Sequence, residues 1–219
     1  MEMRNPAIGA SKVHIGRLVD RYPVLEICRN DLEGAFEILR AAFRGGRKTL
    51  ICGNGGSASD AEHWAGELLK GFCKSRKLHT DPASLSANLR NRLQGGLPII
   101  PLTGFPAFST AFANDVAPEL TFAQLVWVLG VESDCFIGIS TSGHARNVCL
   151  AAEVAQGRRM TRIALTGEDG GDLRSLCDLT IRVPERETYL VQELHLPIYH
   201  CLSLMLEDEF FSIDDAEVR

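Results

Sequence analysis

The stretch CGNGGSASDAEHWAGEL, residues 52–68, decides the fold of this chain. It leads from the end of a short apolar run through a glycine-rich turn into a helix. Glycines allow a positive φ and a close approach of the backbone to a ligand, and free N–H groups at a helix start bind anions. The stretch therefore predicts a strand–turn–helix unit whose turn holds a phosphate. A plain tight turn with a serine cap is the alternative, because the turn is neither a GxGxxG fingerprint nor a P-loop.

The helix in this stretch has two faces. Its apolar residues form a stripe at helical spacing: Ala61, Trp64, Ala65 and Leu68. On the opposite side, His63 and Glu67 lie one turn apart, since residues four apart share a helix face. Such a pair can share a metal ion or move a proton. On a solvated face it would form only a weak ion pair, which is the alternative.

Apolar runs and helical patterns alternate along the chain, and this alternation predicts the fold class. We expect five strands, at residues 49–52, 97–102, 135–139, 163–165 and 179–183. Helices between most of them imply a parallel sheet with helices on both faces, which is an α/β three-layer sandwich. Ligands of such sheets bind at the carboxyl ends of the strands, where the polar turns of this chain fall.

Helices are expected at both ends of the chain. Residues 11–44 should be helical in two pieces that break near Pro23. A long final helix should run from about 190 to 211, with Pro197 kinking it near Glu193.

Residues 73–96 are less regular and look like an insertion with one short helix. Asp81 would cap this helix, with Pro82 at its first position and Leu85, Leu89 and Leu93 on one face. No linker or internal repeat marks a second domain. We therefore expect one domain over 1–219, with a helical segment at 11–44 and the sheet and site at 48–211.

Composition sets limits on the function. The chain has 219 residues, of which 45% are hydrophobic, as in an ordinary soluble globular protein. Its net charge of −5 argues against nucleic-acid binding. The basic cluster Lys74, Arg76 and Lys77 is interpreted as a solvated charge run, with attraction of phosphosugars as the alternative. Seven cysteines without CxxC spacing suit a reducing cytoplasm. No apolar run has the length of a signal-peptide core or a membrane span.

A second polar turn, STSG at 140–143, follows the third expected strand. Ser140, Thr141 and Ser142 can offer side-chain and backbone donors to a phosphate, whereas capping of the next helix would need only one hydroxyl. That helix carries the apolar stripe Val148, Ala151, Ala152 and Ala155. Two such turns at one sheet edge favour a shared ligand site.

The final helix carries polar residues in an apolar setting: Gln192, Glu193, His195 and His200. Neutral imidazole is a good zinc ligand, and a carboxylate or amide oxygen can complete a tetrahedron. The alternative is a partly exposed helix whose histidines are surface residues or satisfied core groups.

Together these motifs resemble the SIS (sugar isomerase) domain family and, within it, the phosphoheptose isomerases. The resemblance covers about residues 30–211 and rests on GNGGSASDAEHWAGEL, FAND at 112–115, GISTSG at 138–143, ALTGEDGG at 164–171 and QELHLPIYH at 192–200. It implies a flavodoxin-like sheet and a homotetramer with active sites near subunit contacts. It also implies a phosphosugar aldose–ketose isomerase that converts sedoheptulose 7-phosphate to D-glycero-D-manno-heptose 7-phosphate.

The resemblance assigns roles to residues. The zinc ligands would be His63, Glu67, Gln192 and His200. The substrate contacts would be Glu67 and Gln192 with Asn54, Gly55, Gly56, Ser57, Asn114, Asp115, Ser140, Thr141 and Ser142. Glu67 would be the base and His200 the acid of an enediol mechanism, and Zn²⁺ would polarise the carbonyl. A carboxylate fully committed to zinc is a poor base, so Glu67 would alternate between the two roles or be shared loosely by the metal.

Three features depart from the family pattern. His144 and Ala145 stand where the family has an amide and a hydroxyl, Leu190 replaces a common arginine, and the 73–96 segment is longer. They bear on which phosphosugar is bound more than on the reaction. Two alternatives therefore stay open: an isomerase of another phosphosugar, and a sugar-phosphate-binding regulatory protein without catalysis. The Glu67–His200 pair favours catalysis, because a binding module needs neither an acid nor a base.

Overall fold

The computed structural model describes residues 6–78 and 84–211. Within them, five parallel strands form one sheet in the order β2-β1-β3-β4-β5. The strands are β1 (Thr49–Cys52), β2 (Ile99–Pro101), β3 (Cys135–Ile139), β4 (Thr161–Thr166) and β5 (Leu179–Arg182). The predicted fold class and all five predicted strands are confirmed. β2 is shorter at both ends than expected, and β4 begins two residues earlier.

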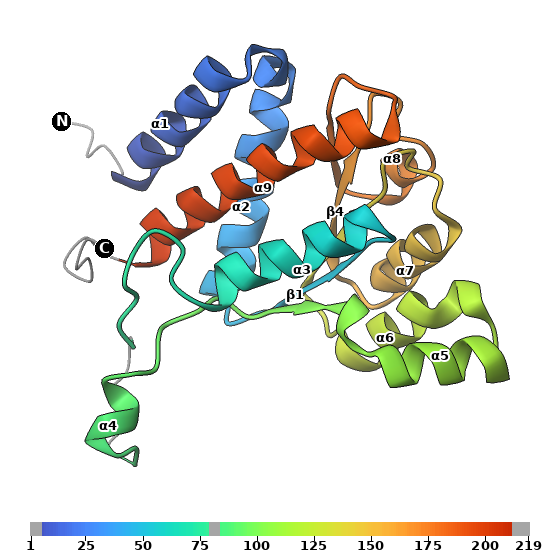
Figure 1. The fold of residues 1–219 in the computed structure, drawn as a ribbon, viewed down its shortest axis with the longest axis horizontal. Coiled ribbons are helices and arrows are strands. Elements are labelled where there is room, and N and C mark those ends of the chain that lie inside the picture. Colours follow the sequence, from blue (N-terminus) through green and yellow to red (C-terminus); the bar gives the residue numbers. More distant parts are fainter. Residues whose placement is uncertain (1–5, 79–83, 212–219) are drawn as a thin grey trace.

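Helices cover both faces of the sheet, as expected (Figure 1). On one face lie α2 (Arg29–Arg44), α3 (Gly56–Leu69) and α9 (Thr188–Phe210), with α1 (Pro6–Arg21) packed against α9. On the other face lie α6 (Thr121–Leu129), α7 (Arg146–Gly157) and α8 (Leu173–Leu176), with α5 (Pro106–Asp115) next to α6. The final helix is continuous through Pro197; the bend predicted there stays a prediction.

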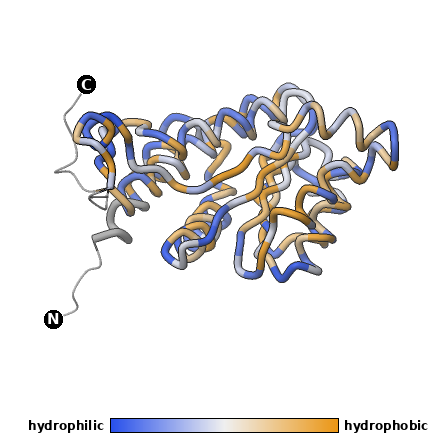
Figure 2. The backbone as a smooth tube through the Cα atoms, turned by 90° about the horizontal axis from the view of Figure 1, so that it is seen from below, coloured by the Kyte–Doolittle hydropathy of each residue, from blue (hydrophilic) through white to orange (hydrophobic). Residues whose placement is uncertain are grey.

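Each strand divides its side chains between two cores, because successive residues of a strand point to opposite faces. Ile51 and Ile137 pack with α2, α3 and α9, whereas Leu50 and Phe136 pack with α6 and α7. Both predicted helical stripes are buried: Ala61, Trp64, Ala65 and Leu68 on α3, and Val148, Ala151, Ala152 and Ala155 on α7. Figure 2 shows the hydrophobic strands running through the centre of the molecule, with hydrophilic segments toward the outside.

The break predicted in the N-terminal helical region is present. α1 ends at Arg21, a 3-10 helix η1 (Pro23–Cys28) follows, and α2 starts at Arg29. Tyr22, the residue before the proline, has a ψ of 76°, outside the helical range. This is the expected effect of proline on its preceding residue, since the ring clashes with a helical conformation there.

The segment at 73–96 carries one short helix, α4 (Ala87–Arg90), which lies at the end of an arm that projects from the body (Figure 1). Ser86 caps it, because its hydroxyl accepts from the Leu89 N–H at 3.4 Å. The predicted leucine face is wrong: the helix is a single turn, and Leu89 and Leu93 are about half exposed. The predicted cap Asp81 and the adjacent Pro82 lie outside the described residues.

The interpretation of the basic cluster as a solvated charge run is wrong for Arg76. Its side chain is fully buried and forms an ion pair with Glu207 of α9 at 2.8 Å. Lys74 is also engaged, with Asp208 at 2.7 Å, while Lys77 is exposed as expected. A charge so deep needs a partner, and here that partner comes from a distant part of the chain.

All seven cysteines are free thiols, as their spacing predicted. Five of them sit in strands or helices of the cores, where burial raises the thiol pKa; for Cys28 it reaches about 12. Within residues 6–78 and 84–211, no helix combines the length and the apolar character needed to cross a membrane.

Candidate active site

The candidate site lies where the strand order reverses. β1 and β3 are neighbours, and the chain leaves them in opposite directions across the sheet, which opens a crevice at their carboxyl ends. The turn after β1 and the turn after β3 both border this crevice. They are joined by a reciprocal pair of amide hydrogen bonds between Asn54 and Asn147, each 2.9 Å long.

The glycine turn after β1 is shaped for close approach. Gly55 has a φ of +54° and stands at the N-terminal end of α3, which has no side-chain cap. A Cβ on Gly56 would lie 2.5 Å from the Gln192 amide nitrogen, so that amide lies directly over the turn. The buried Ser57 does not cap the helix, and the alternative of a plain serine-capped turn is therefore wrong. The Ser57 N–H donates to the Asn54 carbonyl oxygen at 3.0 Å, which leaves the N–H groups of Gly55 and Gly56 for an anion.

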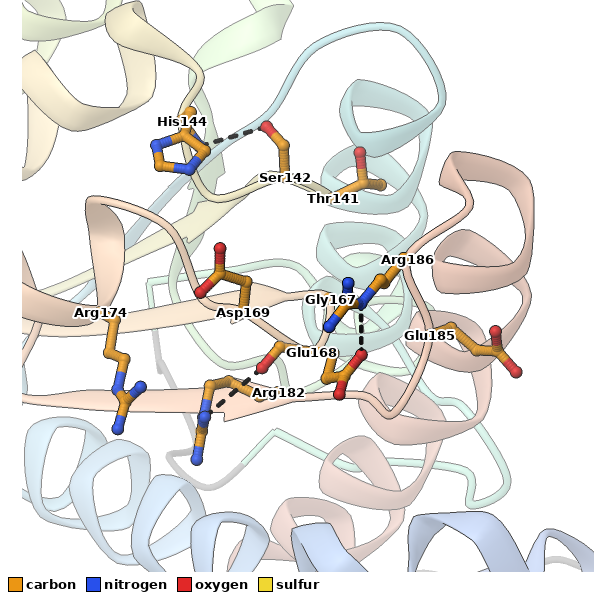
Figure 3. A pocket seen from close by; sticks show the side chains of 10 residues that line it. All are labelled: Thr141, Ser142, His144, Gly167, Glu168, Asp169, Arg174, Arg182, Glu185 and Arg186. Atoms are coloured by element: carbon orange, nitrogen blue, oxygen red, sulfur yellow. Dashed lines mark hydrogen bonds and ion pairs between the residues drawn. The ribbon is translucent and has the colours of Figure 1, made fainter.

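The three hydroxyls of the second turn have different surroundings. Ser140 is buried, and its hydroxyl accepts from the N–H groups of Gly143 at 3.1 Å and Ala145 at 3.4 Å. This closes the turn before α7 without capping the helix, whose N-terminus has no side-chain cap. Ser142 accepts from the His144 N–H at 3.2 Å and, with Thr141, lines an open cavity of about 490 Å³ (Figure 3).

The far wall of this cavity is charged. Figure 3 shows Arg174, Arg182 and Arg186 around the cavity, with Glu168 bound to Arg186 at 2.7 Å. His144 contacts Asp172 through Nδ1 at 3.0 Å, and the hydrogen bond to that carboxylate raises the pKa of His144. The histidine that departs from the family pattern is thus tied to the loop after β4.

The reactive residues of α3 and α9 meet in one cluster. One ligand atom each from His63, Glu67 and His200 lies within 4.8 Å of the others. His63 Nε2 is 3.1 Å from Glu67 Oε1, and the His63 and His200 rings are 5.1 Å apart. This set of two imidazoles and one carboxylate could hold a divalent metal such as zinc. We call these three residues the reactive cluster.

His200 has the properties of a ligand. Its Nε2 atom is buried and has no hydrogen-bond partner among the described residues. Burial, with a smaller repulsion from His63, lowers the pKa of His200 and favours the neutral imidazole. A neutral ring with an unused buried lone pair fits metal coordination, because the ion would supply the missing partner.

Tyr199 orients the His63 ring through Nδ1, the nitrogen that does not contact Glu67. The Tyr199 hydroxyl lies 3.0 Å from His63 Nδ1 and 3.3 Å from Asp60 Oδ1. If this hydroxyl donates to the Asp60 carboxylate, His63 Nδ1 carries the proton and donates to the tyrosine oxygen. His63 Nε2 then keeps its lone pair toward Glu67. Such partners behind a metal-binding histidine fix its tautomer and ring orientation.

The remaining predicted residues fall in separate places. Gln192 lies over Gly56 and has no hydrogen bond to the reactive cluster among the described residues. Asn114 and Asp115 are exposed at the end of α5 and bond to each other at 2.8 Å. Glu193 is exposed. His195 is a core group whose Nε2 lies 3.3 Å from the Thr166 carbonyl oxygen, as the core alternative stated.

Sequence reasoning missed three residues at this site: Asn147, Tyr199 and Arg76. Tyr199 is the residue before the predicted His200. It lies four residues after His195, so the sequence indicated that these two side chains share a face of the final helix. Asn147 and Arg76 gave no local signal, because their partners lie 93 and 131 positions away in the chain.

Known proteins resemble this chain over most of its length. A family model for the SIS domain matches residues 110–206. The phosphoheptose isomerase of Trichlorobacter lovleyi is 39% identical over 183 residues, which are 84% of each chain. The structure of a phosphoheptose isomerase from Francisella tularensis matches with a TM-score of 0.71 at 30% identity, covering 89% of this chain and 95% of that one. One from Neisseria gonorrhoeae matches with a TM-score of 0.69 at 30% identity, covering 88% and 94%.

Proposed function

This chain belongs to the phosphoheptose isomerase family of SIS-domain proteins, and from that premise we propose that it converts sedoheptulose 7-phosphate to D-glycero-D-manno-heptose 7-phosphate. One observation carries the proposal: two residues of the reactive cluster, His63 and Glu67, stand on the same helix, α3, that presents its uncapped N-terminus to the crevice. His63 lies seven residues after Gly56, which is about 10 Å along the helix. A phosphate at the helix start and a carbonyl at the cluster therefore require an extended phosphosugar between them.

The phosphate end of the site consists of neutral donors. We assign it to the N–H groups of Gly55 and Gly56 at the start of α3, with the side chain of Ser57 and the hydroxyls of Thr141 and Ser142. Ser140 supports this end by closing its turn. Asn54 and Gln192 border the crevice and would contact the sugar hydroxyls, and Asn114 and Asp115 complete the predicted contacts.

The reaction moves one proton between two neighbouring carbons. Glu67 acts as the base that takes the proton from the hydroxyl-bearing carbon and returns it to the former carbonyl carbon. His200, whose Nε2 faces the metal, would donate its Nδ1 proton to the carbonyl oxygen as the enediol forms and take a proton from the neighbouring hydroxyl as the product carbonyl appears. Both residues are partly buried, so the proton exchanges within the site rather than freely with solvent.

A zinc ion held by His63, Glu67 and His200 is part of the proposal, with Gln192 as the expected fourth ligand. When bound, it would supply a positive charge that polarises the substrate carbonyl. The unpaired Nε2 of His200 and the orientation of His63 by Tyr199 support this assignment. Glu67 would then be shared between the metal and the substrate proton.

We further propose that the chain acts as one domain in a cytoplasmic homotetramer whose sites lie near subunit contacts. Exposed apolar side chains are available to be buried in such contacts, including Trp127 and Val128 on α6 and Ile27 in η1. The exposed Asn114 and Asp115 would approach a substrate only from such a neighbouring position. Free thiols throughout the chain suit a reducing compartment.

The test is an isomerase assay on purified protein with zinc and sedoheptulose 7-phosphate, comparing wild type with Glu67→Gln. We expect turnover by the wild type and a loss of about 10²–10⁴-fold in the variant, which keeps the size of the side chain but not the base. Binding of the substrate without turnover would reject catalysis in favour of a regulatory sugar-phosphate-binding protein. Turnover of a different phosphosugar would correct the substrate, a result for which His144 and Ala145 are the first residues to examine.

A further inference from the structure

A buried ion pair lies next to the reactive cluster and takes no part in the chemistry described above. Arg76 Nε is 2.8 Å from Glu207 Oε1, and the two side chains are 0% and 1% exposed. The guanidinium also lies over the Phe211 ring, 4.6 Å from its centroid. Two charges this deep are costly to bury, and such a pair persists when every donor and acceptor finds a partner.

Arg76 holds the end of the helix that carries Glu67. Its Nη1 donates to the Leu68 carbonyl oxygen at 2.8 Å, and its Nη2 donates to the carbonyl oxygen of Glu67 itself at 2.9 Å. The last carbonyls of a helix have no partners within the helix, and here a buried cation supplies them. The backbone of the proposed base is therefore fixed by Arg76.

Glu207 holds the other side of the cluster. Its carboxylate accepts from the N–H groups of Phe72 and Cys73, each at 2.9 Å. These contacts place the Phe72 ring against His200, with 5.5 Å between the ring centroids. One ion pair thus determines both the position of the Glu67 backbone and the packing of the His200 ring.

We propose that Arg76 is a positioning residue: paired with Glu207, it sets the distance between Glu67 and His200 for proton transfer. The proposal rests on the isomerase function proposed above, because it concerns the acid and base of that reaction. Arg76 touches neither substrate nor metal and acts only through the α3 terminus and Phe72.

An arginine is required here for a geometric reason. Three of its nitrogens reach three acceptors on two different elements, which a single ammonium cannot do. Arg76→Lys keeps the charge beside Glu207 but removes the partner of the Glu67 carbonyl oxygen and leaves the Leu68 carbonyl oxygen with only the Leu97 N–H. The helix end that carries Glu67 is then free to shift, while the buried charge stays paired.

The chain offers a matched control in the residues just before β1 and β3. Asp134 is also a buried carboxylate that accepts from two backbone N–H groups, those of Lys48 and Val131, and pairs with one basic side chain. Asp134→Asn should lower the melting temperature without moving α3 or α9. Any effect of Arg76→Lys that Asp134→Asn does not share is local to the reactive cluster.

The experiment compares wild type, Arg76→Lys and Asp134→Asn in three measurements: melting temperature, imidazole NMR signals of metal-free protein, and kcat and KM. We expect Arg76→Lys to shift or broaden the His200 ring signals and to lower kcat at least about 10-fold with KM within about twofold. Asp134→Asn should match the wild type in both. Glu207→Gln, which keeps one acceptor oxygen, is measured instead if Arg76→Lys does not fold.

The proposal is overturned if Arg76→Lys and Asp134→Asn show the same His200 signals and the same kcat. A wild type that does not turn over the sugar phosphate rejects the isomerase function instead. In that case the ring signals of the metal-free variants still decide whether Arg76 positions the cluster, because they need neither substrate nor metal.

Discussion

Two polar clusters lie at different places in the fold, and their hydrogen bonding differs. At the amino edge of the sheet, just before β1 and β3, the Asp134 carboxylate accepts from the N–H groups of Lys48 at 3.1 Å and Val131 at 2.9 Å and pairs with Lys48 Nζ at 2.5 Å. The reactive cluster lies between α3 and α9, and among the described residues it has one internal contact, at 3.1 Å, and a buried His200 nitrogen without a partner.

The difference separates groups that stabilise the fold from groups that are kept for a ligand. A buried carboxylate with all its partners contributes to stability, and removing its charge leaves donors unpaired. A buried polar atom without a partner costs about 1–3 kcal/mol, which a functional site tolerates because the ligand later supplies the contact. Changes at Asp134 should therefore lower stability, and changes in the reactive cluster should lower activity.

The largest expected effect comes from a pair of matched amide substitutions. Glu67→Gln should lower kcat about 10²–10⁴-fold while changing the free energy of unfolding by less than about 1 kcal/mol, because it breaks only a partly exposed contact. Asp134→Asn should destabilise the fold by about 2–3 kcal/mol and leave kcat unchanged. Thermal unfolding and steady-state kinetics on both variants measure the four values. Equal losses of stability in Glu67→Gln and Asp134→Asn would contradict the predicted difference between the two clusters.

A second prediction uses His195, whose ring has a hydrogen-bond partner at only one of its two nitrogens among the described residues. Nε2 lies 3.3 Å from the Thr166 carbonyl oxygen, and Nδ1 has no partner among these residues. Burial lowers the pKa of His195 from 6.5 to about 4. The unfolded state then binds a proton below pH 6.5 and the folded state only below about 4, so stability falls as the pH drops through this window. The loss should reach about 3 kcal/mol.

Urea unfolding at several pH values measures this slope, and His195→Gln is the matched variant. Glutamine keeps an N–H for the Thr166 carbonyl but has no proton to gain in acid. We expect the pH slope of this variant to be flatter than that of the wild type. An unchanged slope would show that other groups control acid stability.

The smallest expected effect sharpens the comparison within the reactive cluster. Tyr199→Phe removes the hydroxyl 3.0 Å from His63 Nδ1 and should weaken zinc binding about 10–100-fold. Competition with a chelator measures the affinity, and Tyr22→Phe serves as a control with the same chemical change outside the cluster. Equal affinities in both variants would mean that the tyrosine does not orient His63.

Much of the fold could be predicted because its signals are local. The apolar runs of β1 and β3 and the stripes on α3 and α7 lie within short stretches, so their periodicity is visible in the sequence. The ends of β2 and β4 were less accurate, since strand pairing rather than composition sets them. The break at Pro23 followed from the chemistry of proline alone.

The candidate site was predicted in part, and what was missed depended on contacts distant in sequence. His63 and Glu67 share a helix face by their spacing, but His200 joins them only because α9 packs against α3. Arg76 was misread because its charge suggested solvent, whereas Glu207 lies 131 positions later. Ser140 was assigned to the ligand, yet its hydroxyl closes the turn.

The arm that carries α4 leaves and rejoins the body at one point. The Gly95 N–H donates to the Arg76 carbonyl oxygen at 2.9 Å, and the Leu97 N–H donates to the Leu68 carbonyl oxygen at the same distance. These two hydrogen bonds hold the ends of the arm together, which makes the arm suitable for exchange in protein engineering. A loop whose ends already lie close together can be replaced at little entropic cost. A recognition peptide or a reporter tag inserted between residues 77 and 94 would be displayed beside the reactive cluster, while Arg76 keeps the anchorage independent of the length of the graft.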